Sequence, residues 1–309
     1  MITQWNFRDH CLVCGGNELK IIRTEKNSLI ENDILKPYLQ KDSSLVSCKQ
    51  CHMAFVQSIP NDDQFYASIY AGSNRDVSID FKYSGKLAIF DQIKTSLLKY
   101  NTSGTLLDIG TGTGAFLNQM KTHFKTTGVE LGSSAREYAR SIGFEVFEAP
   151  VGKLPFPAES YDVVTIIDVL EHLPDPTAAM SEIHRVLKIG GLLYIKVPNY
   201  KMQVTKQNIL NFLKLSKEGM MGDYIHINHF CPKSLSALAN HRGFEILESG
   251  FSKSELWNLK WQEAPRPLFY RILRNILVQT TSVFLEIGSF IFRKDLGLNI
   301  YILIRKVNK

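Results

Sequence analysis

Short strand-like segments, most of them rich in apolar and β-branched residues, alternate with helix-compatible segments through the middle of this chain. The strand-like segments lie at about 105–109, 125–130, 144–148, 161–167 and 191–197. Short segments of this composition between helical segments are typical of strands in a parallel sheet. The alternation of strands and helices predicts an α/β fold, with a doubly wound, mostly parallel sheet covered by helices on both faces.

The segments that follow this region add further strands and helices to the predicted fold. Two more strands are expected near 244–251 and 298–305, which makes the sheet seven-stranded, and a helix near 234–241 precedes them. The stretch 199–223 is Lys-rich and partly helical in pattern, and could lie over an acceptor site as a lid. Ser133 is expected to cap the helix that follows the second strand.

The chain is predicted to have three parts. Residues 1–60 form a small lobe, residues 61–103 a helical cover, and residues 104–309 the main domain. A helical insertion at about 252–297 separates the last two strands of the main domain.

A glycine-rich turn is the most informative motif. The apolar run that begins at Leu106 reaches Asp108 and then meets three glycines, Gly110, Gly112 and Gly114. Glycine is needed where a nucleotide-like ligand lies against bare backbone, because a Cβ would hold the ligand away and would penalise a positive φ. The pattern predicts a nucleotide-binding turn between a strand and a helix.

Two acidic residues narrow the choice of ligand. Asp108 stands where dinucleotide-binding turns carry an apolar residue, and its charge would repel a pyrophosphate but attract an ammonium group. Glu130 follows the turn by about 20 residues and ends the next predicted strand, where a carboxylate can accept both hydroxyls of a ribose. Together they favour S-adenosylmethionine over NAD.

From Gly104 to Phe251 the chain resembles the class I S-adenosylmethionine-dependent methyltransferases. Four ordered blocks carry the resemblance: the turn after Leu106, Glu130, the segment 161–176 and the segment 182–199. The resemblance implies a Rossmann-like methyltransferase fold, S-adenosylmethionine as the cofactor, and a transferase activity.

The resemblance also implies a set of cofactor contacts. Many relatives carry an acid at the adenine edge where this chain has Pro150, so backbone groups near Val151 or Gly152 are expected to supply that contact. Asp168 is expected to frame the methionine end, and Tyr70 to lie over it. The expected contacts are Tyr70, Asp108, Gly110, Thr111, Gly112, Gly114, Glu130, Leu131, Val151, Gly152 and Asp168.

Four of the five cysteines form two pairs near the N-terminus. Cys11 and Cys14 are separated by 33 residues from Cys48 and Cys51, and four thiolates at this spacing can hold one Zn²⁺. A shell of four cysteines leaves no position for water or substrate, which indicates a structural metal. His10 and His52 flank the pairs and are interpreted as bystanders. Similar front modules occur in methyltransferases that modify sugars in bacterial glycan and natural-product clusters.

Three histidines are candidates for removing a proton from an acceptor hydroxyl. His172 follows the fourth predicted strand at the edge of the sheet where ligands bind, and His226 and His229 precede the last core helix. An unperturbed imidazole has a pKa near 6.5 and suits this role. Pocket shaping, helix capping and a His226/His229 metal site are the alternatives.

Charge and hydropathy bear on partners and compartment. Residues 252–309 contain ten basic and four acidic residues and so hold the whole net charge of +6. A segment at 268–292 has an amphipathic pattern, which predicts packing on its own domain, a homodimer contact or a membrane-surface contact. No secretory signal or spanning segment is evident, so a cytoplasmic location is expected.

The leading hypothesis is therefore a methyltransferase that acts on a hydroxyl or amine of a small molecule, of sugar or glycan type. The alternatives are an RNA base methyltransferase with a zinc ribbon, a sugar C-methyltransferase and a non-catalytic cofactor-binding scaffold. Residues 1–60 carry seven basic and six acidic residues, and this near-neutral charge disfavours a nucleic-acid partner.

Overall fold

The fold is taken from a computed structural model, which describes residues 5–25, 43–61, 86–212, 226–240, 243–253 and 297–308. Its centre is a seven-stranded sheet, and this confirms the predicted α/β architecture. The strands are β6 (Gly104–Ile109), β7 (Phe124–Val129), β8 (Glu145–Phe147), β9 (Tyr161–Ile167), β10 (Leu187–Pro198), β12 (Phe244–Ser252) and β13 (Asn299–Lys306).

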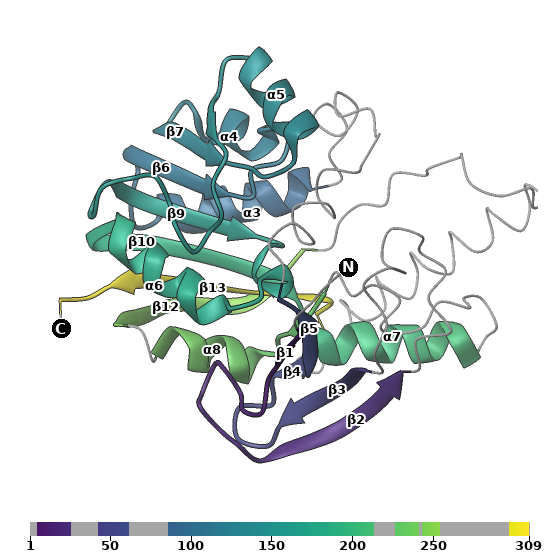
Figure 1. The fold of residues 1–309 in the computed structure, drawn as a ribbon. Helices are drawn as coiled ribbons and strands as arrows, with labels where there is room; N and C mark the ends of the chain where they lie inside the picture. The colour runs from purple at the N-terminus through teal and green to yellow at the C-terminus, as the bar shows by residue number, and fades with distance from the viewer. Residues whose placement is uncertain are drawn as a thin grey trace, which may run out of the picture.

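The order across this sheet is β12-β13-β10-β9-β6-β7-β8 (Figure 1). β13 runs antiparallel to both of its neighbours, and the remaining pairs are parallel. The chain winds from β6 toward β8 and then returns to the other side of β6 at β9. Ligands in doubly wound sheets bind beyond the carboxyl ends of the strands at such a reversal point.

Helices cover both faces of the sheet. One face packs against α3 (Leu87–Leu98), α4 (Ala115–Met120) and α5 (Ser133–Ser141), and the other against α6 (Pro176–Val186) and α8 (Pro232–Asn240). Alternate residues of β10 pack against the helices on the two faces of the sheet, because successive side chains of a strand point to opposite faces. Leu192 and Tyr194 pack in one layer, and Leu193 and Ile195 in the other.

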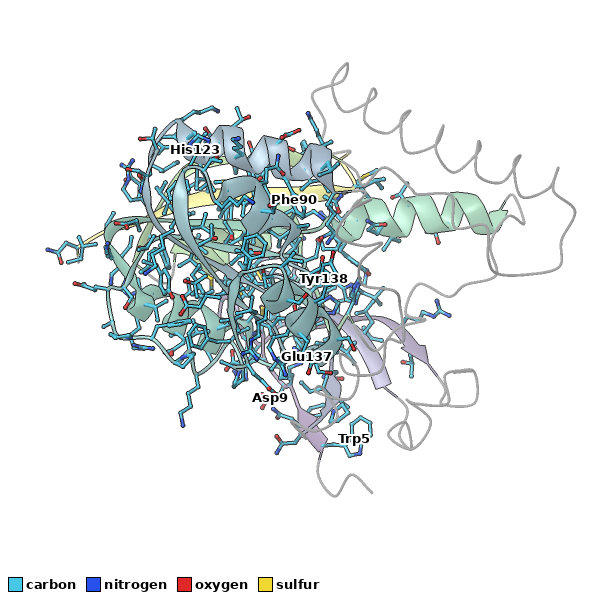
Figure 2. All side chains as sticks on the ribbon, turned by 90° about the horizontal axis from the view of Figure 1, so that it is seen from above. Trp5, Asp9, Phe90, His123, Glu137 and Tyr138 are labelled. Carbon is cyan, nitrogen blue, oxygen red and sulfur yellow. The ribbon has the colours of Figure 1, made fainter. Side chains whose placement is uncertain are left out.

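The residues before the main sheet form a second small sheet. Its strands are β2 (Leu19–Glu25), β3 (Ser43–Cys48), β4 (Ala54–Val56) and β11 (Asn228–His229), in the order β11-β4-β3-β2. A separate pair joins β1 (Trp5–Phe7) to β5 (Ser58–Pro60). We call residues 5–25 and 43–61 the four-cysteine lobe. Figure 2 shows Trp5 and Asp9 of this lobe and His123 of the main domain at opposite edges of the view.

The four-cysteine lobe shares a core with the main domain. Cys11, Met53 and Phe55 belong to the same hydrophobic cluster as Phe230 and Leu235, at the start of α8. The lobe's sheet is also completed by β11, which comes from a segment some 170 residues later in the chain. The two parts are therefore continuous in packing and in backbone hydrogen bonding.

Several expectations differ in detail. Ser133 is the first residue of α5 and its cap is Gly132, without a side-chain cap bond, so the Ser133 cap was wrong. The linker after Pro198 is helical over α7 (Tyr200–Phe212), as its pattern predicts. Tyr70 and the segment 268–292 lie outside the described residues. Among the described residues no helix is long and apolar enough to cross a membrane.

Candidate active site

The glycine-rich turn joins β6 to α4 at the reversal point of the sheet. Gly110, Gly112 and Gly114 have φ angles of 74°, 55° and 80°, which L-residues with a Cβ rarely adopt. A Cβ at Gly110 would overlap the side chain of Val169, whereas no atom of the described residues lies within 4 Å of a Cβ at Gly112. The turn thus packs tightly against Val169 at Gly110, whereas at Gly112 it leaves space beside the backbone.

Asp108 lies beneath this turn at the end of β6. Its side chain is buried and accepts a hydrogen bond from Thr165 Oγ1 at 2.7 Å. Burial raises the pKa of Asp108 to about 7, with the charge of Glu130 acting in the same direction. A cation beside this carboxyl group would restore its ionised form, as the predicted ammonium contact requires.

Glu130 connects the turn to the next loop. Its Oε2 accepts from the amide of Gly112 at 2.8 Å, and its Oε1 accepts from the amide of Gly132 at 2.7 Å. The carboxylate is half-buried and stands directly after β7. Thr111 packs against Gly128 of β7, and the carbonyl of Leu131 accepts from Arg136.

The expected adenine edge lies after β8. Val151 is buried, and Gly152 is exposed, with no described atom within 4 Å of a Cβ. Glu148 is mostly exposed and pairs with Arg136 Nη2 at 2.7 Å. Within the described part of the chain, space is therefore open at Gly152.

Asp168 follows β9 and is held between two lysines. Its carboxylate lies 2.8 Å from Lys86 Nζ and 2.6 Å from Lys196 Nζ, and Lys196 is fully buried. Burial alone would raise the pKa of Asp168, but the two ammonium groups outweigh it and lower the pKa to about 2. Sequence reasoning missed both lysines, although a lysine inside the apolar run of β10 is itself a signal.

A second group of titratable side chains gathers on η3 (Leu170–His172) and the segment before β11. The ring centroids of His172 and His226 are 4.6 Å apart, and His172 Nε2 lies 3.9 Å from Glu171 Oε1. One ligand atom from each of Glu171, His172 and His226 lies within 4.8 Å of the others, so the three could hold a cation. We call these three residues the Glu-His-His cluster.

Burial sets the protonation of this cluster. Glu171 is buried, and neither of its carboxyl oxygens has a hydrogen-bond partner among the described residues. Burial raises the pKa of Glu171 to about 8, with Asp168 contributing. Burial lowers the pKa of His226 to about 4, and the neighbouring His172 adds to this. At neutral pH His226 is therefore a neutral imidazole, and its lowered pKa makes it a weaker base than a free imidazole.

His229 occupies a different setting from the other two candidate histidines. It lies on β11, where it pairs with Ala54 of the four-cysteine lobe, and its ring centroid is 5.0 Å from that of Tyr200. Its Nε2 is buried with no hydrogen-bond partner in the part of the chain that the structure describes, and burial lowers its pKa to about 3. The structure therefore brings His172 and His226 together and places His229 against Tyr200.

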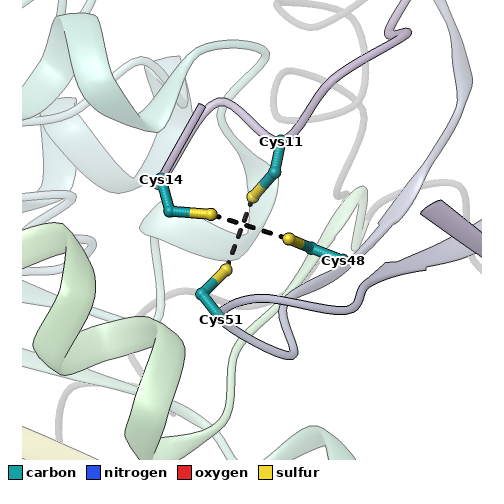
Figure 3. A group of neighbouring side chains, drawn as sticks. All are labelled: Cys11, Cys14, Cys48 and Cys51. Carbon is teal, nitrogen blue, oxygen red and sulfur yellow. Dashed lines mark hydrogen bonds between the residues drawn. The ribbon is translucent and has the colours of Figure 1, made fainter. Parts of the chain in front are cut away.

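The four paired cysteines meet at one point (Figure 3). The sulfurs of Cys11 and Cys51 are 3.5 Å apart, those of Cys14 and Cys48 are 3.6 Å apart, and all four lie within 4.8 Å of one another. Tetrahedral Zn–S bonds of about 2.3 Å place the sulfurs about 3.8 Å apart, so the group fits a zinc ion. His10 and His52 are exposed beside it.

Comparisons with known proteins agree with this geometry. A family model described as a methyltransferase domain matches residues 83–249, just over half of the chain. A ubiquinone biosynthesis O-methyltransferase from Colwellia psychrerythraea is 26% identical over 153 residues, covering 47% of this chain and 62% of the relative. A demethylmenaquinone methyltransferase from Chlorobaculum parvum is 29% identical over 167 residues, covering 51% of this chain and 69% of the relative. The chain thus spans less than two thirds of the first of these relatives.

A solved structure shows the same fold. It is a complex between the Haloferax volcanii Trm112 methyltransferase activator and a methyltransferase, and a chain in it superposes with a TM-score of 0.53 at 17% identity. The match covers 78% of this chain and 98% of that one.

Proposed function

This chain belongs to the methyltransferase-domain family, and on that premise we propose that it is an S-adenosylmethionine-dependent enzyme that methylates a hydroxyl group of a small molecule. The observation that carries the proposal is the position of the Glu-His-His cluster. It lies beyond β9, beside the strand that leads into the glycine-rich turn. We expect a proton acceptor there to serve the acceptor half of the site, since the groups expected to hold the nucleoside follow β6 and β7.

The residues of the turn fit the cofactor. Glu130 already accepts two N–H groups and so presents an acceptor that ribose hydroxyls can use. Open space at Gly112 admits a ligand against the backbone, and buried Asp108 suits an ammonium partner. When bound, S-adenosylmethionine supplies an electrophilic methyl group on a sulfonium. The remaining contacts are proposed to come from Thr111, Leu131, Val151, Gly152, Asp168 and Tyr70.

The protein's part in the reaction is alignment and proton removal. In the proposed transfer the acceptor oxygen would form the new bond to the methyl carbon as the carbon–sulfur bond breaks, and the electron pair of the broken bond would stay on sulfur. The hydroxyl proton passes to His172 or His226, and Glu171, which holds a proton at neutral pH, stands within reach of His172. Correct alignment contributes about 7–11 kcal/mol and general base catalysis about 10²–10⁴-fold.

The relatives and the four-cysteine lobe bear on the acceptor class. Two relatives carry names that refer to quinones, which supports a small-molecule acceptor, and the name of the first, an O-methyltransferase, supports a hydroxyl group as the methylated group. The front module resembles those of sugar-modifying enzymes, which keeps a sugar or glycan precursor as the second candidate. The near-neutral lobe gives no support to RNA as the acceptor. We also propose that the four cysteines hold a structural Zn²⁺.

Methyl transfer from labelled S-adenosylmethionine tests the proposal. The purified full chain would be assayed with a panel of catechols, other phenols and nucleotide sugars, with mass spectrometry to locate the new methyl group. We expect O-methylation that falls about 10²–10⁴-fold in kcat in the His172→Ala and His226→Ala variants. His123→Ala, in the short connection between α4 and β7 and not part of the cluster, is the matched control and should retain activity. Transfer that both cluster variants retain, or transfer to RNA alone, would contradict the proposal.

A further inference from the structure

Backbone hydrogen bonds tie the four-cysteine lobe to the turn that carries Glu171 and His172. β4 pairs with β11, and the amide of Val56 donates to the carbonyl of Ile227 at 3.0 Å. The amide of Ile227 in turn donates to the carbonyl of Glu171 at 2.9 Å. A single extended segment therefore lies between the lobe and η3 and bonds to both.

Arg8 fixes this segment from the side of the lobe. Its side chain is buried, with 4% of its surface exposed, and lies over the ring of Phe55. Its Nε donates to the carbonyl of Val56 at 2.9 Å, Nη2 to the carbonyl of Ile227 at 2.9 Å, and Nη1 to Asn228 Oδ1 at 2.7 Å. A guanidinium group has five donors in a rigid fork, so these bonds define the orientation of both strands at once.

Asn228 fixes the same segment from the side of the main domain. It is 1% exposed, and its amide nitrogen donates to the carbonyls of Leu170 at 3.2 Å and Leu173 at 2.6 Å. These two carbonyls flank Glu171 and His172. The side-chain oxygen of Asn228 therefore accepts a hydrogen bond from Arg8, while its side-chain nitrogen donates to the carbonyls on both sides of Glu171 and His172.

We propose that Arg8 and Asn228 are positioning residues for the Glu-His-His cluster, so that the four-cysteine lobe is a working part of the acceptor half of the active site. The inference rests on the proposed function for the role of His172 and His226 in proton removal. The lobe is connected to the acceptor half of the site and not to the cofactor half, because the hydrogen bonds described above for Asp108 and Glu130 do not involve the lobe. Disturbing the connection should impair methyl transfer and leave cofactor binding intact.

Two variants break the connection at different points. Asn228→Asp keeps an oxygen for Arg8 but replaces the donor to Leu170 and Leu173 with a second acceptor, which repels their carbonyls. Arg8→Lys keeps the charge but cannot reproduce the fork. Lys20→Gln, on an exposed position of β2, is the control within the lobe. Zinc content and thermal melting would establish that each variant is folded.

Three measurements then separate positioning from general stability. Calorimetry with S-adenosylhomocysteine should give the wild-type affinity in all three variants. The histidine ring signals of His172 and His226, followed by NMR at constant pH, should shift in Asn228→Asp and Arg8→Lys but not in Lys20→Gln. With an acceptor from the panel above, kcat should fall about tenfold to a hundredfold in the first two while the KM for the cofactor stays constant.

The outcomes distinguish the two proposals. If the ring signals stay unchanged in folded Asn228→Asp and Arg8→Lys, the positioning role is wrong. If they shift and kcat is unaffected, the lobe sets the geometry of the cluster but the cluster does not remove the proton, so the proposed role of His172 and His226 fails while the structural coupling holds. If affinity for S-adenosylhomocysteine fell by the same factor as kcat, the claim that the lobe affects only the acceptor half of the site would be wrong.

Discussion

At the scale of single residues, Asp168 determines much of the electrostatics beyond β9. It adopts a φ of 56°, a left-handed conformation that costs a non-glycine residue about 1–3 kcal/mol, although aspartate tolerates it better than most. Its ion pairs with Lys86 and Lys196 hold the carboxylate ionised at neutral pH. That fixed negative charge is one reason why the neighbouring Glu171 keeps its proton.

Glu171 should therefore make stability depend on pH. Its pKa is about 8 in the folded protein against 4.5 for the free group, so its contribution is fully present below pH 4.5 and is lost as the pH rises through 8. The loss amounts to a few kcal/mol, on the order of one kcal/mol per pKa unit. Glu171→Gln should remove this dependence and gain free energy of unfolding relative to wild type between pH 5 and about 8.5. Urea unfolding at several pH values would measure the difference, and parallel curves for the two proteins would contradict it.

A separate prediction concerns the contribution of Glu130 to cofactor affinity. Replacing it with glutamine removes the negative charge and one of two acceptor oxygens, and hydrogen bonds to charged groups contribute about 1.5–3 kcal/mol each. The affinity for S-adenosylhomocysteine should fall about tenfold to a hundredfold, as measured by calorimetry. Glu145→Gln, on the exposed start of β8, should bind like wild type. If both variants bound S-adenosylhomocysteine with equal affinity, Glu130 would not be part of the cofactor site.

At the scale of elements, the glycine-rich turn should respond differently to substitution at two of its three positive-φ glycines, Gly110 and Gly112. Gly110→Ala combines a strained φ with an overlap on Val169, so we expect a loss of at least about 3 kcal/mol in unfolding free energy. Gly112→Ala meets open space among the described residues, and its cost should be limited to about 1–2 kcal/mol of backbone strain. The new methyl group at position 112 should still weaken cofactor binding, because it projects where the ligand is expected. Thermal melting and calorimetry of the two variants would separate these effects, and equal destabilisation would contradict the distinction.

The elements of the main sheet can be predicted because local sequence determines them. The pattern predicts β9 over the residues that it occupies, since a mostly apolar segment rich in β-branched residues ends at the acidic Asp168. β11 could not be predicted, because two residues carry no periodicity and their strand conformation depends on β4, far away in the chain.

The same contrast holds for the candidate site. The glycines, Asp108 and Glu130 can be found because they lie within or just after a recognisable strand and turn. The pairing of Asp168 with Lys86, and the bonds from Arg8 to Asn228, join residues that are 82 and 220 positions apart. No pattern along the chain encodes such contacts, so only the folded structure reveals that the four-cysteine lobe reaches the Glu-His-His cluster.

At the scale of the whole molecule, the shared core predicts that metal and main domain unfold together. Cys11, Cys48 and Cys51 are buried in the same hydrophobic cluster as Phe230 and Leu235, so loosening the four sulfurs exposes part of the main core. The purified chain should contain one zinc ion per molecule, and removal by a strong chelator should lower the single melting temperature rather than create an early separate transition.

Metal exchange tests the structural role of that ion. A closed shell of four thiolates leaves no site for water or substrate, so replacing Zn²⁺ with Cd²⁺ should preserve both melting temperature and methyl transfer. Cys48→Ser should lose zinc and melt at a lower temperature, whereas Cys231→Ser keeps all four ligands and should retain the metal. Because the lobe holds β11 and through it η3, a protein stripped of metal but still folded should lose methyl transfer before it loses affinity for S-adenosylhomocysteine. A stripped protein with full activity would show that the lobe and the acceptor half of the site are independent.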